Sequence, residues 1–129
     1  MRKSVPVAAV IFLFIFSGCF NREINLQKRK QDLANRVREY NEHISWREYE
    51  SASIYVVPEE RAEFMAWSAP FKRSLTVESF SIKSAELAPS GEEAEVKVVR
   101  SYVLPPSVTL QTDEFVQTWV VMDGQWYLS

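Results

Sequence analysis

The sequence has few of the residues that build disulfides, metal centres and phosphate-binding loops. Its 129 residues include one cysteine, Cys19, one histidine, His43, and three glycines. A single cysteine excludes a disulfide within the chain, and one cysteine with one histidine cannot form a Cys/His metal cluster. The sequence also contains no Gly-rich phosphate loop and no nucleophile motif. We therefore predict neither a metal site nor a cofactor.

An excess of positive charge is also missing. The chain has 15 basic and 17 acidic residues. Arg2 and Lys3 lie in a leader that we expect to be removed, which leaves 13 basic against 17 acidic residues and a net charge of −4. Proteins that bind nucleic acid need a basic face to displace counterions from phosphates. Nucleic acid is therefore not an expected partner.

The N-terminus has the order of residues typical of a secretory signal. Arg2 and Lys3 are followed by an apolar run from Val5 to Phe16, interrupted only by Pro6. A run of about 12 residues is shorter than the roughly 20 that a membrane-spanning helix needs, so it should direct export without remaining as an anchor. The alternative is an uncleaved signal anchor with a free, buried cysteine.

Phe16-Ser17-Gly18-Cys19 resembles the lipobox of bacterial lipoproteins, although Phe16 replaces the more common leucine. The resemblance implies cleavage before Cys19 and lipid on its thiol, palmitate among the acyl chains, and two or more chains hold a protein stably on a membrane. Phe20 and Asn21 follow in place of an inner-membrane retention aspartate, which favours the outer membrane over the inner. The chain then divides into a signal peptide (1–18), a lipidated tether (19–24) and a domain (25–129) in the bacterial cell envelope.

Periodicity predicts three helices in the first half of the domain. Apolar residues recur at helical spacing over 25–44, with charges on the opposite side. Ser45 and Glu48 have the spacing of a capping box ahead of a second helix at about 46–55. Pro58 suits the first position of a third helix, which Pro70 ends. The apolar stripe of the first helix consists of Leu26, Leu33, Val37, Tyr40 and Ile44.

Beyond Pro70 the apolar residues alternate, which predicts antiparallel strands. A change of phase near Ser79 suggests a bulge or a strong bend in the first strand, and residues 88–91 form a turn cluster. Pro105-Pro106 ends the second strand, and the third runs over about 108–122. One face of the second strand consists of Ala94, Val96, Val98, Arg100, Tyr102 and Leu104.

Asp123-Gly124 predicts a type I′ hairpin between the last two strands, because both residues tolerate positive φ. Such a turn pairs Val121 with Trp126 and Trp119 with Leu128. Three helices followed by four strands with this final hairpin resemble the nuclear-transport-factor-2-like superfamily. The resemblance implies an α+β cystatin-like cone, with N-terminal helices packed on a strongly curved four-stranded antiparallel sheet. Members often dimerise through the open sheet face, so a homodimer is one expectation.

Arg100 is the main candidate for binding a ligand. If its face lines the cone, its guanidinium points inward beside Tyr102 and must be paired. The partner is either an internal glutamate or an anionic ligand held by the guanidinium fork. The other interpretation places Arg100 at a solvated rim or in a purely structural pairing. Aromatic residues either line an apolar pocket or simply form the core; they are Trp46, Tyr49, Tyr55, Trp67, Tyr102 and Trp119. We select Arg100, Tyr102, Trp46, Tyr49 and Trp119 as candidate ligand-binding residues.

No catalytic group can be assigned. Isomerase-like members of the superfamily use an aspartate with a tyrosine, and cyclase-like members use histidine and aspartate. Neither His43 nor any aspartate matches such a position, and the fold itself does not determine activity. The leading hypothesis is a non-enzymatic envelope lipoprotein that binds a protein partner or a small apolar or anionic ligand. The alternatives are a small isomerase- or cyclase-like enzyme acting on a hydrophobic substrate, and a purely structural lipoprotein.

Overall fold

The structure is a computed structural model that describes the backbone of residues 4–129 and the side chains of residues 25–129. Residues 1–31 and 32–129 form two compact units. The Cys19 side chain lies outside the described residues, so its lipidation stays a prediction. Among the described residues, no helix combines the length and the apolar content that crossing a bilayer requires. The elements are α1 (Ser4–Ser45), α2 (Tyr49–Ser53), η1 (Pro58–Glu60), α3 (Arg61–Ser68), η2 (Ala69–Phe71), β1 (Thr76–Leu87), β2 (Glu93–Val103), β3 (Gln111–Met122) and β4 (Gln125–Leu128).

The first predicted helix lies within α1, which ends one residue later than expected and begins much earlier, at Ser4. Its apolar stripe is confirmed from residue 33 onward, where burial drives the helix onto the sheet. Leu33, Val37, Tyr40 and Ile44 are all buried in the core. Leu26 is 36% exposed and does not belong to that core.

A Schellman motif ends α1, and for this reason the predicted capping box is wrong. Arg47 adopts a left-handed conformation with φ 58°. Its N–H donates to the Ile44 carbonyl, and the Glu48 N–H donates to the His43 carbonyl, which is the bonding pattern of that motif. The Ser45 hydroxyl turns back to the Asn41 carbonyl instead of capping a new helix. The second helix is therefore shorter than predicted and begins only at Tyr49.

The four strands form one antiparallel sheet in the order β1-β2-β3-β4. The pairing of β1 with β2 shifts register between Val77 and Ser79, which confirms the irregularity predicted near Ser79. A second shift, between Ile82 and Ser84, was not predicted from the alternation. The third strand starts at Gln111, three residues later than expected.

The final hairpin is confirmed in its turn and its register. Asp123 and Gly124 both have positive φ, 51° and 77°, as a type I′ turn requires. Val121 pairs with Trp126, and Trp119 pairs with Leu128. The outer edge of β4 is closed by residues 55–57, since the Leu128 N–H donates to the Tyr55 carbonyl and the Val57 N–H donates to the Leu128 carbonyl.

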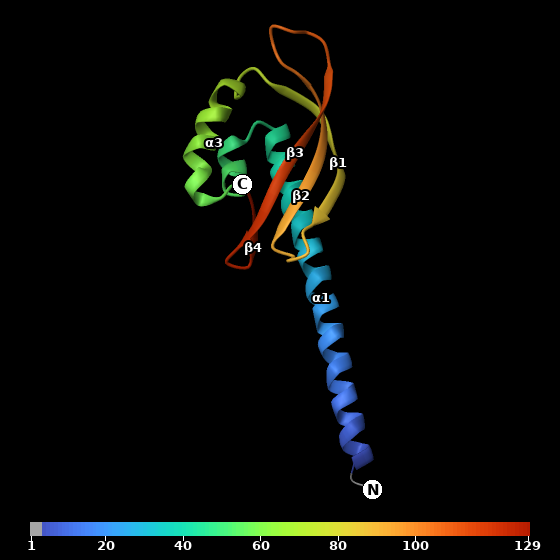
Figure 1. Cartoon of the computed structure of the whole chain (residues 1–129). Helices are drawn as coiled ribbons and strands as arrows, with labels where there is room; N and C mark the ends of the chain where they lie inside the picture. Colours follow the sequence, from blue (N-terminus) through green and yellow to red (C-terminus); the bar gives the residue numbers. More distant parts are fainter. Residues whose placement is uncertain (1–3) are drawn as a thin grey trace. The chain divides into compact units, whose positions relative to one another are not determined.

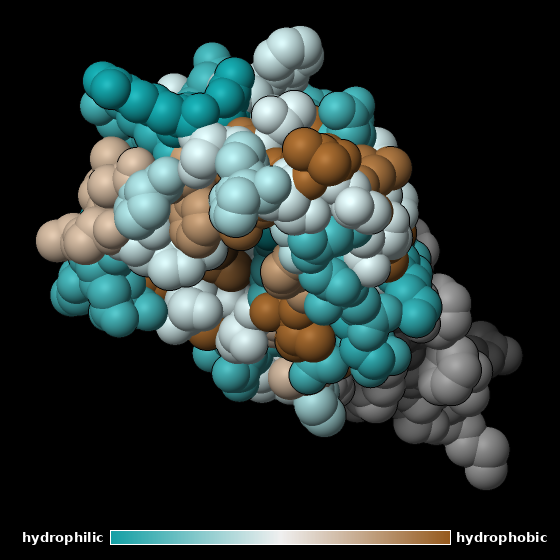
Figure 2. Space-filling model, turned by 90° about the horizontal axis from the view of Figure 1, so that it is seen from above, coloured by the Kyte–Doolittle hydropathy of each residue, from teal (hydrophilic) through white to brown (hydrophobic). Residues whose placement is uncertain are grey.

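The domain is therefore α+β, with N-terminal helices packed on one face of a four-stranded antiparallel sheet (Figure 1). Buried residues of α1, α2, β2, β3 and β4 make up the core between the two layers. On the face seen in Figure 2, hydrophobic residues form separate small groups between polar ones.

Candidate ligand-binding site

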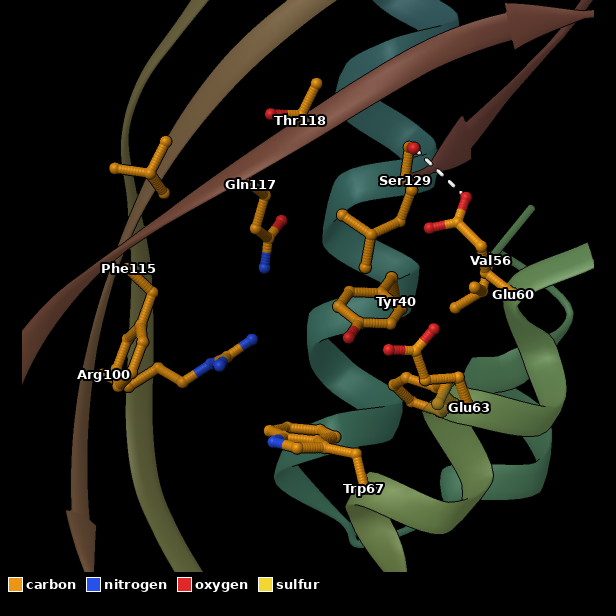
Figure 3. Close-up of a pocket in the computed structure, with 13 residues that line it drawn as sticks. Tyr40, Val56, Glu60, Glu63, Trp67, Arg100, Phe115, Gln117, Thr118 and Ser129 are labelled. Atoms are coloured by element: carbon orange, nitrogen blue, oxygen red, sulfur yellow. Dashed lines mark hydrogen bonds between the residues drawn. The ribbon is translucent and has the colours of Figure 1, made fainter.

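Alternation along β2 places Arg100 on the inner face of the sheet. Ala94, Val96 and Val98 precede it on the same face and are buried in the core. Arg100 is held over the Phe115 ring of β3, with its guanidinium carbon 5.1 Å from the ring centroid. In Figure 3 the side chain crosses from the sheet toward Tyr40 on α1. The prediction that this guanidinium points inward is confirmed, and the solvated-rim interpretation is wrong.

A buried amide network fixes the position of the guanidinium. Arg100 Nη2 donates to Asn41 Oδ1 over 2.6 Å. Gln117 Nε2 donates to the same oxygen over 3.1 Å, and Asn41 Nδ2 donates to the Val37 carbonyl over 2.8 Å. The Trp119 indole N–H in turn donates to Gln117 Oε1. The network therefore orients one edge of the guanidinium, and on that edge Arg100 has the structural partner that the sequence analysis left open.

The guanidinium itself is left largely without acceptors. It has five N–H donors, and the protein accepts one of them among the described residues. Glu114 pairs with Lys83 and Glu48 contacts the His43 ring, whereas no carboxylate of the described residues pairs with Arg100. The predicted ion pair between Arg100 and an internal glutamate is therefore wrong. Two buried atoms in this region also have no hydrogen-bond partner, Arg100 Nε and the Tyr49 hydroxyl.

The phenols around Arg100 are held in their neutral form. Burial raises the pKa of Tyr40 to about 12, although the positive charge of Arg100 acts in the opposite direction. Burial also raises the pKa of Tyr49, again opposed by Arg100. Burial lowers the pKa of Arg100, but an arginine remains charged at any physiological pH. The immediate surroundings of Arg100 thus combine one cation with the neutral phenols of Tyr40 and Tyr49.

Two cavities meet at Arg100. The larger, about 430 Å³, lies between α3 and β3, with Glu60 and Glu63 among its polar residues. Figure 3 shows this cavity, with Glu63 and Trp67 on α3 facing Arg100 and Phe115 across it. The smaller, about 150 Å³, is lined mainly by apolar side chains. Its apolar and aromatic lining consists of Ile44, Tyr49, Trp67, Phe71, Leu75, Val77, Tyr102, Leu104 and Phe115. Arg100, Trp67 and Phe115 line both cavities.

The structure brings three of the five predicted site residues together. Arg100, Tyr49 and Tyr102 line the smaller cavity. The Tyr102 hydroxyl is already engaged, since it donates to Asp113 over 2.5 Å. Trp119 belongs to the core, and Trp46 is 77% exposed on the surface outside both cavities. His43 faces Glu48, with Nδ1 3.2 Å from Oε1, and lines neither cavity.

Asn41 and Gln117 were missed by the sequence analysis. Both are buried, with exposed fractions of 0% and 7%. Asn41 interrupts the apolar stripe next to Tyr40, and Gln117 lies on the inward parity of β3 between Phe115 and Trp119. A polar amide at an inward position was the available signal, because a buried amide needs partners.

Comparison with known proteins identifies the fold but not the family. No protein-family model matches the chain, and no curated protein matches it. Among solved structures, it resembles a SEC-C motif containing protein from Rhodopseudomonas palustris (TM-score 0.58, 11% identity, 69% of this chain and 68% of that one). It also resembles a candidate polyketide cyclase from Xanthomonas campestris pv. campestris (TM-score 0.52, 15% identity, 76% and 87%). A protein of unknown function from Nostoc punctiforme, with a cystatin-like fold, matches similarly (TM-score 0.51, 14% identity, 77% and 84%). The chain therefore has the cystatin-like fold.

Proposed function

We propose that this protein is a lipid-anchored envelope lipoprotein whose cystatin-like domain binds a small apolar, anionic ligand at Arg100 without converting it. The observation that carries the proposal is the position of the Arg100 guanidinium. It is held beside two cavities, and no acidic side chain of the described residues pairs with it. An uncompensated buried charge is costly. A bound anion would supply the missing acceptors, and the guanidinium fork matches the oxygens of such an anion.

The chemistry of the cavity walls favours binding over catalysis. The lining of both cavities contains no histidine, aspartate or cysteine. The raised pKa values of Tyr40 and Tyr49 keep these phenols as neutral hydrogen-bond donors. Donors and a fixed cation suit an anion that is held, whereas general acid–base chemistry works best with groups that titrate near neutral pH.

An enzyme of the cyclase type is the second candidate. The fold match to a candidate polyketide cyclase supports it, together with the Glu63 carboxylate on the wall of the larger cavity. In that case the Glu63→Gln variant should retain binding of the ligand but lose its conversion. The non-enzymatic proposal expects ligand recovered unchanged from the wild-type protein.

The small separate apolar groups on the face in Figure 2 do not favour a protein partner at that face. Homodimer formation through the sheet stays a prediction. The proposed anchor depends on Cys19, which is the sole cysteine. Lipid there would hold the binding domain at a membrane surface, where apolar acids partition.

Anchor and binding are tested separately. The Cys19→Ala variant should fail to incorporate labelled palmitate in cells and should accumulate as the uncut precursor. Unchanged labelling of this variant would remove the lipoprotein assignment. Binding is tested by a thermal-shift screen of small acids and neutral apolar compounds on the full-length chain in detergent micelles, because a ligand of the folded state raises the unfolding temperature. A screen in which no compound of either kind binds contradicts the binding role.

A further inference from the structure

The smaller cavity contains a second polar group that the fold leaves without a partner. Tyr49 is 2% exposed, and its hydroxyl has no hydrogen-bond partner. Among the residues whose side chains the structure describes, Arg100 Nε is the other buried atom without a partner, and both residues line this cavity. Buried polar groups are nearly always hydrogen-bonded, so two unpartnered groups on residues that line one cavity indicate a missing acceptor.

The charge at the site limits that acceptor to a single negative charge. Arg100 is the sole lysine or arginine among the residues that line the two cavities. Glu60 and Glu63 on the neighbouring cavity would repel further negative charge. A carboxylate has one charge and two coplanar oxygens, which can accept from a guanidinium and a phenol at once.

The size and lining of the smaller cavity limit the rest of the ligand. Its volume of about 150 Å³ is lined by aliphatic and aromatic side chains apart from Arg100 and the tyrosine hydroxyls. An apolar cavity of roughly this volume holds a single benzene ring. Glu60 and Glu63 make the larger cavity the less favourable location for an apolar body.

We infer that the ligand is a compact monocarboxylic acid, with a single ring or a short branched chain in the smaller cavity and its carboxylate between Arg100 and Tyr49. This inference rests on the proposed function, because it uses the same arginine. Tyr49 is a binding residue in this account, and its hydroxyl donates to the ligand. Arg100 Nε and the Tyr49 hydroxyl are shielded from water, so binding requires a neighbouring side chain to move aside. Trp67 is the candidate, because it is half-exposed and lines the same cavity.

The test uses benzoate as the probe and the full-length chain in detergent micelles. Equilibrium dialysis measures bound benzoate, with protein-free micelles to subtract partitioning. We expect saturable binding of benzoate and at least about tenfold weaker binding of neutral benzamide, because charge-assisted hydrogen bonds are lost. Tyr49→Phe removes one hydroxyl and should weaken binding several-fold, while Arg100→Met should abolish it.

Matched controls exclude general effects of substitution. Tyr127→Phe removes a phenol outside both cavities, and Arg38→Met removes an exposed cation of α1; both should bind benzoate like the wild type. The unfolding temperature of Arg100→Met should equal or exceed that of the wild type, and Tyr49→Phe tests the same carboxylate contact with a smaller change.

Three results would overturn the inference. Equal binding of benzamide would exclude recognition of the carboxylate, and unchanged binding by Tyr49→Phe would exclude the hydroxyl. Binding of long-chain acids alone, still dependent on Arg100, would exclude the smaller cavity while leaving the proposed function intact. If neither acids nor neutral compounds bind, the proposed function fails as well.

Discussion

Replacement of Arg100 by methionine distinguishes a binding residue from a structural one. A structural arginine stabilises the fold, so its loss should destabilise the protein. A ligand-binding arginine has few acceptors in the free domain, so its removal should change the free energy of unfolding little. We expect Arg100→Met to leave the free energy of unfolding unchanged or to raise it by about 1 kcal/mol.

The expected value follows from the contacts of the side chain. The substitution removes the 2.6 Å hydrogen bond to Asn41, worth about 1.5–3 kcal/mol for a charged donor. It also removes the contact with the Phe115 ring, worth about 0.5–2 kcal/mol. Against these losses, it removes a desolvation penalty of several kcal/mol for a largely buried ion. Asn41 Oδ1 keeps its bond from Gln117 Nε2, so no acceptor is left unpaired.

Urea unfolding followed by the fluorescence of the buried tryptophans measures this difference. The unfolding free energy of Asn41→Ala is the reference for a structural loss. This variant disrupts the same network and leaves both Arg100 and Gln117 without the oxygen that accepts their hydrogen bonds. That variant should lose about 3 kcal/mol. If Arg100→Met loses as much as Asn41→Ala, the arginine is a structural member of the network and the argument for an anionic ligand is refuted.

Two further predictions concern Tyr40 and the final turn. The pKa of Tyr40 is raised to about 12 in the folded state against about 10 unfolded, so its contribution to stability is complete below pH 10 and is lost as the pH rises through 12. Between pH 10 and 12 we expect the unfolding free energy of Tyr40→Phe to fall by about 3 kcal/mol less than that of the wild type. Urea unfolding at a series of alkaline pH values measures the two falls. Equal falls in the variant and the wild type would contradict the burial of this phenol. Gly124 has φ 77° with nothing within 4 Å of an added Cβ, so Gly124→Ala should lose about 1–2 kcal/mol through backbone strain alone. Circular dichroism melts would check this value, and an unaltered melting temperature would mean that the turn is not of the I′ type.

Much of the fold could be predicted from the sequence because local patterns and burial agree. The helical spacing of Leu33, Val37 and Ile44 and the alternation of Val96 with Val98 each matched the face that became buried. The final hairpin followed from the φ preferences of Asp and Gly. The end of α1 was harder to predict, because Arg47 occupies a left-handed position that normally suggests glycine.

The candidate site could be predicted only in part because it depends on contacts between distant elements. Alternation placed Arg100 on the correct face. Its neighbours, Asn41 on α1 and Gln117 on β3, lie 59 and 17 residues away in the sequence, and no local pattern links them. Of the five predicted site residues, three line the smaller cavity, one lies in the core and one lies on the surface. Tertiary packing determines these locations, and the sequence does not predict it for single residues.

The central claim is that an anion accepts hydrogen bonds from the free donors of Arg100. The ¹H–¹⁵N resonance of the Arg100 Nε–H group reports this directly, and Arg100→Met identifies it by its disappearance. In a titration with benzoate, we predict a saturable downfield shift of the proton as the carboxylate accepts its hydrogen bond. A resonance that stays in place while benzoate binds would contradict the claim.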